Sequence, residues 1–592
     1  MIASALLESL RQGYSVTDLR RDILAGITVG IIALPLSMGL GIASGVAPEN
    51  GLYTAIIAGI LIALTGGSRF NISGPTAAFV VILLPITAKY GLGGLAIATF
   101  MSGVILVVMG LCRLGRLIAY IPYPVTIGFT SGIAVVIASL QLKDFFGIPL
   151  AQSPEHFFER IALLASALPS LNVWDALTAL TTLGVFLGWR QLKTTIPPHL
   201  PALITGITFS LLVMFLNDNA VVATLGSQFG WQVGEASGNG IPPFLPQFIW
   251  PWQQPEANGL PIGLSFELIR DLASSAFVIA MLGALESLLC AVVGDGMTRT
   301  RHNPNSELIG QGIGNLVVPF FGGIPATAAI ARTATNIRSG GTSPVAAMTH
   351  ALFVLLSILL LAPVLAYIPM ASLAALLVMV AWNMGEFHHF ARIAKVAPRA
   401  DVAVLFTCFG LTVIFDMVVA VSVGLLLAGL LVIKRMSEMT QLQVPETSSQ
   451  VAGLSLTSTQ SIPADVALYQ VNGPLFFGAA QKALETLRTV DKSIRVVILD
   501  MSPVNMIDMT AIVALESILT DVAANHTHVV LSGLLPRLQA KLVKAGITES
   551  EHMSFSASIE QSLNLDTVRA PIAAPVEASH GPATLKVQIR IQ

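Results

Sequence analysis

Two glycine-rich stretches of similar composition lie far apart in the chain, and each could present backbone groups to an anion. The first runs Gly66-Gly-Ser-Arg-Phe-Asn-Ile-Ser-Gly-Pro-Thr-Ala-Ala78, and the second runs Phe321-Gly-Gly-Ile-Pro-Ala-Thr-Ala-Ala329. Because proline is best tolerated in the first turn of a helix, we expect helices to begin at about Thr76 and Ala326. Each helix start would offer free backbone N–H groups and roughly half a positive charge to an anion.

Close packing between membrane helices is the competing explanation, because Gly, Ala and Thr are common where such helices touch. For a single stretch of this kind, packing is the better explanation. Two interrupted segments at matching positions in two halves of a membrane chain instead indicate the binding site of a transporter. The matched pair therefore favours a binding site.

Two ionisable residues lie inside predicted membrane spans. Glu286 lies within Leu282-Gly-Ala-Leu-Glu-Ser-Leu-Leu-Cys290, where a charged carboxylate costs several kcal/mol unless it is paired, so function is the default hypothesis. Arg332 follows Pro325 by seven residues, and we expect it about two turns into the second helix. It could be the partner of Glu286 or a positive wall for an anion. A purely structural pair that holds two helices together is the alternative.

Composition excludes several classes of protein. Only 11% of the 592 residues are charged, 54% are hydrophobic and the mean hydropathy is +0.77, which excludes a wholly soluble protein. The net charge of -2 gives no sign of nucleic-acid binding. No G-x-x-x-x-G-K-[ST] motif occurs, so ATP-driven transport is unsupported. Neither a disulfide framework nor a zinc cluster is available to the three widely spaced cysteines, Cys112, Cys290 and Cys408. We expect no metal, no cofactor and no enzymatic activity.

Hydropathy predicts about 14 membrane segments. The predicted segments are 23–44, 51–65, 71–88, 93–111, 117–142, 173–189, 200–216, 266–294, 308–320, 322–338, 345–361, 366–382, 401–416 and 418–433. Segments 71–88 and 322–338 begin with Gly and Pro, and we expect each to be a half-helix.

The distribution of Lys and Arg predicts the orientation in the membrane. Residues 217–265 contain neither, and this loop is expected outside, whereas the short loops that carry most of the Lys and Arg are expected in the cytoplasm. Both termini are then cytoplasmic. The stretch 143–172 is an exception, because it should lie outside and yet carries Lys143 and Arg160.

Strand-like and helix-like runs alternate after Arg435, which predicts a small cytoplasmic α/β domain. The strand-like runs are 466–471, 496–499 and 529–531, and the helix-like runs cover 476–490 and begin near Thr510 and Leu535. The expected domains are a cytoplasmic segment 1–22, a membrane domain 23–436, a linker 437–463, the α/β domain 464–568 and a disordered tail 569–592.

Together these residues resemble the SulP family of anion transporters, which carry a C-terminal STAS domain. The family-like segments are Ser73–Thr76, Asn305–Asn315, Phe320–Gly323 and Ala331–Asn336. Within the family the chain is most similar to bacterial C4-dicarboxylic acid transporters, across Asp22–Ile32, Thr65–Phe70, Ile118–Ile133 and Ala284–Val293.

The resemblance implies a polytopic α-helical fold of 14 membrane segments, arranged as two inverted repeats of seven and divided into a core and a gate domain. Substrate would bind between the third and tenth segments, and the core would move as an elevator. The site residues that it implies are Pro35, Leu36, Ser37, Thr76, Ala77, Ala78, Glu286, Ile330, Ala331 and Arg332.

The resemblance also bears on the coupling ion. Eukaryotic relatives often have Ser where Ala331 stands, so backbone N–H groups would carry substrate affinity here. A related bicarbonate carrier has Asp and Thr where this chain has Glu286 and Cys290. That difference puts sodium coupling in doubt and favours protons carried by Glu286.

In the C-terminal domain, Ile498–Ser502 and Ile507–Ala511 resemble the two characteristic loops of STAS domains. Thr510 occupies the position where anti-sigma-factor antagonists carry a phosphorylated Ser, so it is a regulatory candidate. A cap on the following helix, from Asp508 or Thr510, is the alternative role and the one we favour.

The resemblance implies a multi-pass protein of the bacterial inner (plasma) membrane that takes up C4-dicarboxylates such as succinate, fumarate and aspartate with protons. Sulfate or bicarbonate is the alternative substrate. A membrane-anchored anion sensor that signals through the STAS domain is the alternative of another class. The expected partners are the small anion, protons, membrane lipid, a second copy of the chain and a cytoplasmic protein bound by the STAS domain.

Overall fold

The computed structural model describes residues 2–116, 122–150, 154, 156–192, 194, 196–218, 220–233, 236–415, 417–438, 441–443, 463, 465–475, 494–524 and 526–569. The chain divides into two compact units, Met1–Ala428 and Gly429–Gln592.

The first unit is built from long apolar helices, eight of which, in the described part of the chain, are long and apolar enough to cross a membrane. The first seven segments come from α2 (Val16–Ala43), α3 (Pro48–Thr65), α4 (Ala77–Leu111), α5 (Tyr123–Phe145), α7 (Val173–Trp189) and α8 (His199–Leu216). Helix α4 supplies two of them, because Gly91 interrupts it at φ 65°.

Seven further segments follow in the same order. They are α10 (Phe266–Thr298), α11 (Pro304–Val317), α12 (Ile330–Arg338), α13 (Val345–Leu365), α14 (Met370–Met384), α16 (Arg399–Ile414) and α17 (Met417–Glu438). Every predicted membrane segment therefore has a counterpart among these elements. The polytopic helical architecture predicted from the sequence is confirmed.

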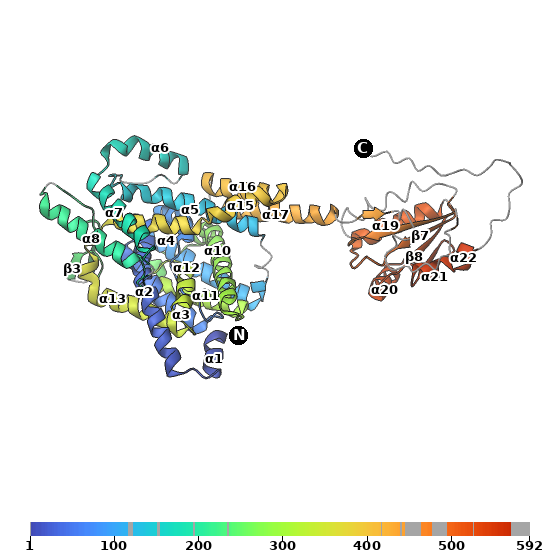
Figure 1. Cartoon of the computed structure of the whole chain (residues 1–592), viewed down its shortest axis with the longest axis horizontal. Helices are drawn as coiled ribbons and strands as arrows, with labels where there is room; N and C mark the ends of the chain where they lie inside the picture. Colours follow the sequence, from blue (N-terminus) through green and yellow to red (C-terminus); the bar gives the residue numbers. More distant parts are fainter. Residues whose placement is uncertain are drawn as a thin grey trace, which may run out of the picture. The chain divides into compact units, whose positions relative to one another are not determined.

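The helices of the first unit pack as two bundles (Figure 1). Helices α2, α3 and α4 pack against α10, α11, α12 and α13, whereas α5, α7 and α8 pack against α14, and α5 also against α16. Each bundle thus takes elements from both halves of the chain. The bundle of α2, α3, α4 and α10 to α13 corresponds to the expected core, and the bundle of α5, α7, α8, α14 and α16 corresponds to the expected gate.

The core bundle depends on close contact between α4 and α11. A Cβ added to Gly103 would lie 2.6 Å from the backbone nitrogen of Leu316, and one added to Gly312 would lie 2.7 Å from that of Val107. Any side chain at either position would push the two helices apart. The glycines of α11 are therefore packing residues.

Two short buried strands pair with each other inside the core bundle, each just before a half-helix. Strand β1 (Ser73–Gly74) pairs antiparallel with β4 (Thr327–Ala328), and α4 and α12 begin within three residues of them. Antiparallel pairing of two corresponding strands is what a twofold axis between the halves produces. The strands hold the two helix starts next to each other.

The prediction that a helix begins near Thr76 is confirmed, since α4 begins at Ala77, but the prediction for Ala326 is wrong. Residues 325 and 326 lie outside any helix, Thr327 and Ala328 form β4, and α12 begins only at Ile330. Bonds outside a helix satisfy this backbone: the Ala326 N–H donates to Asn315 Oδ1 at 2.8 Å, and Thr327 and Ala328 pair with β1.

Several short elements were not predicted. They are α1 (Ser4–Arg11), α6 (Phe157–Ala167), α9 (Leu225–Gln228), α15 (Phe387–Val396), the hairpin β2 (Gly230–Val233) and β3 (Ala236–Asn239), and the 3-10 turns η2 (Leu168–Ser170), η3 (Pro251–Gln253) and η4 (Val318–Phe321). Helix α6 lies in the stretch 143–172 that departs from the charge rule.

The second unit contains a five-stranded sheet of order β5-β6-β7-β8-β9, parallel except for β5. The strands are β5 (Gln441–Gln443), β6 (Val466–Asn472), β7 (Val496–Asp500), β8 (His528–Ser532) and β9 (Met553–Ser556). The helices are α19 (Met509–Ala523), α20 (Pro536–Lys544), α21 (Ile559–Leu563) and α22 (Asp566–Arg569). The α/β domain is confirmed, with all three predicted strands. The predicted helix 476–490 and nearly all of the predicted linker and tail lie outside the described residues.

Candidate functional site

The starts of α4 and α12 contribute backbone donors to the candidate site. No hydrogen bond within the described residues uses the N–H groups of Ala77 and Ala78, or of Ile330, Ala331 and Arg332. Ala331 is exposed and Ile330 is 37% exposed, whereas Ala77 and Ala78 are buried. A ligand could therefore reach the start of α12 directly.

Glu286 and Thr76 join the third predicted segment to α10. The Thr76 hydroxyl donates to Glu286 Oε2 at 3.0 Å, and Thr76 is also the residue that precedes the first turn of α4. The structure therefore brings the predicted coupling residue to one of the two predicted substrate-binding segments. Protonation of Glu286 would change the charge directly beside that helix start.

Arg332 connects the two half-helices. It is the third residue of α12, not two turns into a helix as predicted, because the preceding stretch is extended. Its Nη2 donates to the carbonyl of Pro75 at 2.9 Å, and its buried Nη1 has no partner among the described residues. Glu286 and Arg332 form no direct ion pair in the described part of the chain. The geometry agrees better with a positive wall than with a structural pair.

Pro35, Leu36 and Ser37 lie in the interior of α2 and are all buried. Proline has no N–H to donate, so the carbonyl of Ile31 loses its helical partner in this turn. The Ser37 hydroxyl oxygen is buried and has no hydrogen-bond partner within the described residues. Within the described residues, this turn of α2 therefore contains a buried hydroxyl without a hydrogen-bond partner, at a position where the family resemblance implies a site residue.

One buried carboxylate behind the site, that of Glu307, is not among the site residues predicted from the sequence, although it lies in the family-like segment Asn305–Asn315. Glu307 is 1% exposed, and its Oε2 accepts from the N–H groups of Gly67 and Ser68 at 2.9 and 3.0 Å. Its Oε1 accepts from Asn71 Nδ2 at 2.8 Å and from Gln311 Nε2 at 3.1 Å. Glu307 therefore holds the loop that leads into β1.

The corresponding loop of the second half is held by Asn315. Its Oδ1 accepts from the Ala326 N–H, and its Nδ2 donates to the Ala326 carbonyl at 2.9 Å. Glu307, Gln311 and Asn315 are spaced by four residues, so they line one face of α11. Polar residues at that spacing in an otherwise apolar helix are a signal that could have identified this network from the sequence.

A buried contact between α10 and α12 lies next to this network. Thr333 Oγ1 accepts from the Ile72 N–H at 3.0 Å, and Cys290 Sγ donates to the same oxygen at 3.0 Å.

No group of three His, Cys, Asp or Glu side chains that could hold a metal ion occurs among the residues that the structure describes.

In the second unit, Asp508 caps α19, since its Oδ1 accepts from the Ala511 N–H at 2.7 Å. Of the two caps that the sequence allowed, the structure has the one from Asp508. Thr510 is exposed, and its hydroxyl makes no hydrogen bond within the described residues.

Comparison with known proteins gives two family matches. Residues 19–408 match the sulfate permease family, and residues 458–562 match the STAS domain.

Two relatives and one solved structure are similar over most of the chain. The "Putative sulfate transporter YvdB" of Bacillus subtilis is 41% identical over 90% of this chain and 95% of its own length. The bicarbonate transporter BicA of Picosynechococcus is 31% identical over 89% of this chain and 91% of its own length. A structure described as the overall structure of SLC26A9 has a TM-score of 0.79 at 18% identity, over 95% of this chain and 92% of that one, and it supports the fold.

Proposed function

The chain belongs to the sulfate permease family of anion transporters, and from this premise we propose that it takes up C4-dicarboxylates together with protons. The observation that carries the proposal is the meeting of two half-helix starts at β1 and β4, with Arg332 between them. The resemblance of four sequence stretches to bacterial C4-dicarboxylic acid transporters selects the substrate class.

The charges at the site suit a small anion with up to two negative charges. Each helix start contributes roughly half a positive charge, and the Arg332 guanidinium contributes one more. The free N–H groups of Ile330 and Ala331 can bind a carboxylate oxygen without any polar side chain. A second carboxylate of the same substrate would lie toward the Thr76 side.

Glu286 is the proposed carrier of the coupling proton. Its carboxylate lies one hydrogen bond from Thr76, so its protonation state alters the potential at the substrate site. Neutral Glu286 favours the bound dianion, and ionised Glu286 disfavours it, because like charges repel in a poorly solvated site. Substrate and proton would then cross the membrane together.

The division into two bundles supports an elevator mechanism. The half-helices and Glu286 belong to the core bundle, while the other bundle contains α5, α7, α8, α14 and α16. A core that slides past the gate would carry the whole site across the membrane. We place the protein in the bacterial plasma membrane as a homodimer with both termini in the cytoplasm.

Sulfate or bicarbonate is the second candidate substrate, because the two relatives are named for sulfate and bicarbonate transport. Sulfate satisfies the same charge argument as a dicarboxylate. The deciding measurement is uptake of labelled succinate into proteoliposomes, with competition by unlabelled sulfate, bicarbonate and fumarate. Competition by fumarate alone supports the dicarboxylate, whereas uptake of labelled sulfate or bicarbonate that succinate does not inhibit would replace it.

An anion sensor that signals through its STAS domain is the alternative of another class. The sensor hypothesis does not explain why two half-helices at matching positions in the chain begin next to each other. The proteoliposome experiment also separates these classes, since a sensor would bind anions without accumulating them. In a transporter, we propose that the STAS domain binds a cytoplasmic partner and that Thr510 is its regulatory residue.

A further inference from the structure

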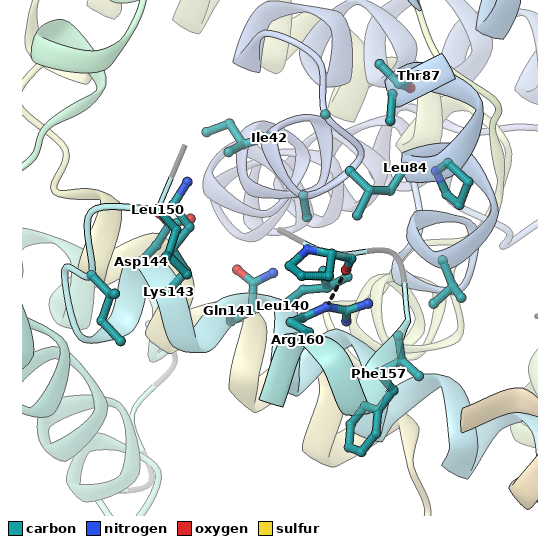
Figure 2. Close-up of a pocket in the computed structure, with 18 of the residues that line it drawn as sticks. Ile42, Leu84, Thr87, Leu140, Gln141, Lys143, Asp144, Leu150, Phe157 and Arg160 are labelled. Carbon is teal, nitrogen blue, oxygen red and sulfur yellow. Dashed lines mark hydrogen bonds between the residues drawn. The ribbon is translucent and has the colours of Figure 1, made fainter. Parts of the chain in front are cut away.

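A cavity of about 1650 Å³, here called the Lys143 vestibule, lies in the first unit (Figure 2). The residues that line it do not include those at the starts of α4 and α12, here called the half-helix site. Its walls come from the end of α2, the first part of α4, α5, α6 and the end of α16. Figure 2 shows Leu140, Gln141 and Arg160 on one wall, with Ile42 and Leu84 across from them. The cavity is larger than the roughly 300–1,000 Å³ typical of small-molecule sites, so it can hold a hydrated ion.

The lining of the Lys143 vestibule is rich in basic groups. Arg160, Lys143, Lys89 and His156 line it, against the carboxylates of Asp144 and Asp175. Asp175 is 3% exposed, and its Oδ1 accepts from the Ala223 N–H at 3.2 Å. Within the described residues the Lys143 ammonium makes no hydrogen bond or ion pair, so it can bind a ligand.

Arg160 is a fixed group in this wall. Only 3% of it is exposed, its Nε donates to the carbonyl of Pro154 at 3.1 Å, and its Nη1 donates to Ser139 Oγ at 3.0 Å. These bonds join α6 to α5 and fix the orientation of the guanidinium. A positive charge held in this way acts on the vestibule without reorganising.

The vestibule also accounts for the departure from the charge rule. Gln228 and Phe229 of the loop without Lys or Arg line the same cavity as Lys143 and Arg160. In the orientation predicted from the sequence, the two basic residues therefore lie on the outer side of the membrane, where Lys and Arg are normally scarce. A ligand-binding role explains their retention there.

One wall of the vestibule is formed by α4, the helix that begins at the substrate site. Val81, Leu84 and Ala88 line it, and these positions are spaced by three or four residues along one face of α4. Ala77, in the first turn of α4, is on the same face one turn earlier. An anion in the vestibule would lie along a helix that leads to the half-helix site.

We propose that the Lys143 vestibule is a second anion-binding site, in which Lys143 and Arg160 hold the small carboxylate or oxyanion before it reaches the half-helix site. This inference rests on the proposed function for the identity of the anion, but the presence of the site does not. Lys143 is the residue to test, because Arg160 is buried and its removal could disturb folding.

The binding test does not require transport. Ala88→Cys, placed in a full-length Cys112→Ser background, provides a thiol in the vestibule that membrane-impermeant methanethiosulfonates can modify from outside. The measured quantity is the modification rate of the negatively charged sulfonate reagent divided by that of the positively charged trimethylammonium reagent. We expect this ratio to be about threefold or more higher when Lys143 is present than when it is replaced. Added Lys143→Gln should reduce this ratio, and millimolar succinate or sulfate should slow modification only when Lys143 is present.

Lys395→Gln is the matched control, because it removes the same charge at an exposed position of α15. An unchanged reagent ratio in Lys143→Gln, or equal effects of both variants, would overturn the proposal. The second readout is uptake of labelled succinate and sulfate at low ionic strength. There Lys143→Gln should raise KM about threefold or more with Vmax retained, Lys143→Arg should restore KM, and added salt should reduce the difference.

The two readouts separate this inference from the proposed function. If the wild-type protein takes up neither succinate nor sulfate but both anions still protect the thiol of the Ala88→Cys variant, the transport proposal fails and the vestibule site stands. If uptake is normal and neither the reagent ratio nor KM depends on Lys143, transport stands and the vestibule site is wrong.

Discussion

At the residue scale, Glu286 and Arg332 make different contacts at the same site. The Glu286 carboxylate accepts a bond from Thr76, and the Arg332 guanidinium donates to the carbonyl of Pro75. Each charged side chain therefore contacts the residues that lead into α4, and they do not neutralise each other by direct contact. Removing either one should produce a distinct functional defect.

Glu286→Gln should abolish accumulation of substrate driven by a pH gradient, while exchange of substrate across the membrane continues. The amide keeps the shape of the side chain and can still accept the bond from Thr76, but it cannot bind or release a proton. The measurement is proteoliposome uptake with and without a pH gradient. Full proton-driven uptake in this variant would remove Glu286 from the mechanism.

Arg332→Ala should weaken substrate binding by about tenfold or more, because hydrogen bonds to charged groups contribute about 1.5–3 kcal/mol. The backbone donors of α12 remain, so the protein should still insert in the membrane. The control is Arg338→Ala, which removes an exposed arginine from the last turn of the same helix. If Arg332 were only structural, its variant would be unstable in detergent while substrate affinity in the folded fraction stayed normal.

At the element scale, the half-helices depend on a buried polar face of α11. Glu307 and Asn315 each hold the loop before one of the two paired strands. Each does so through hydrogen bonds to backbone groups of residues that are not helical. Buried polar groups that lose their partners cost about 1–3 kcal/mol each. The geometry of the site is therefore maintained from behind, by residues that cannot touch substrate.

Glu307→Gln should destabilise the membrane unit by about 2–3 kcal/mol, because the carboxylate accepts four hydrogen bonds and an amide presents N–H groups to some of those donors. Thermal unfolding in detergent measures the loss. Glu267→Gln, at an exposed position of α10, is the matched control and should change stability little. Equal melting temperatures for the two variants would show that the network is not needed for folding.

Much of this element-scale structure follows from the sequence, because long apolar runs have few alternatives in a membrane. The exceptions are sequence patterns that are compatible with two different local backbone structures. Gly-Gly-Ile-Pro-Ala-Thr-Ala suits a helix start and also a non-helical segment, and contacts with Asn315 and with strand β1 select the latter. Contacts between distant segments, such as that of Arg332 with Pro75, depend on how the two repeats pack and have no local signal.

At the scale of the whole molecule, the candidate transport residues and the STAS domain belong to different units. Every residue of the half-helix site, the α11 network and the Lys143 vestibule lies within Met1–Ala428, and the sheet with Thr510 lies within Gly429–Gln592. The second unit has its own buried core on both faces of β7, which includes Val497 and Leu499 on one face and Val496 and Ile498 on the other. Binding of the anion should therefore not require the STAS domain.

A chain truncated after Ser437 should still bind the anion with an affinity similar to that of the full-length protein, although its turnover can fall. The reason is that no residue of the proposed transport site lies beyond that point, so the domain would act on rate, trafficking or assembly. Binding and uptake of labelled succinate and sulfate, compared between the two forms after membrane insertion is verified, measure this. If a well-folded truncated protein lost binding, the STAS domain would have to complete the site, and the two half-helices would be insufficient for recognition.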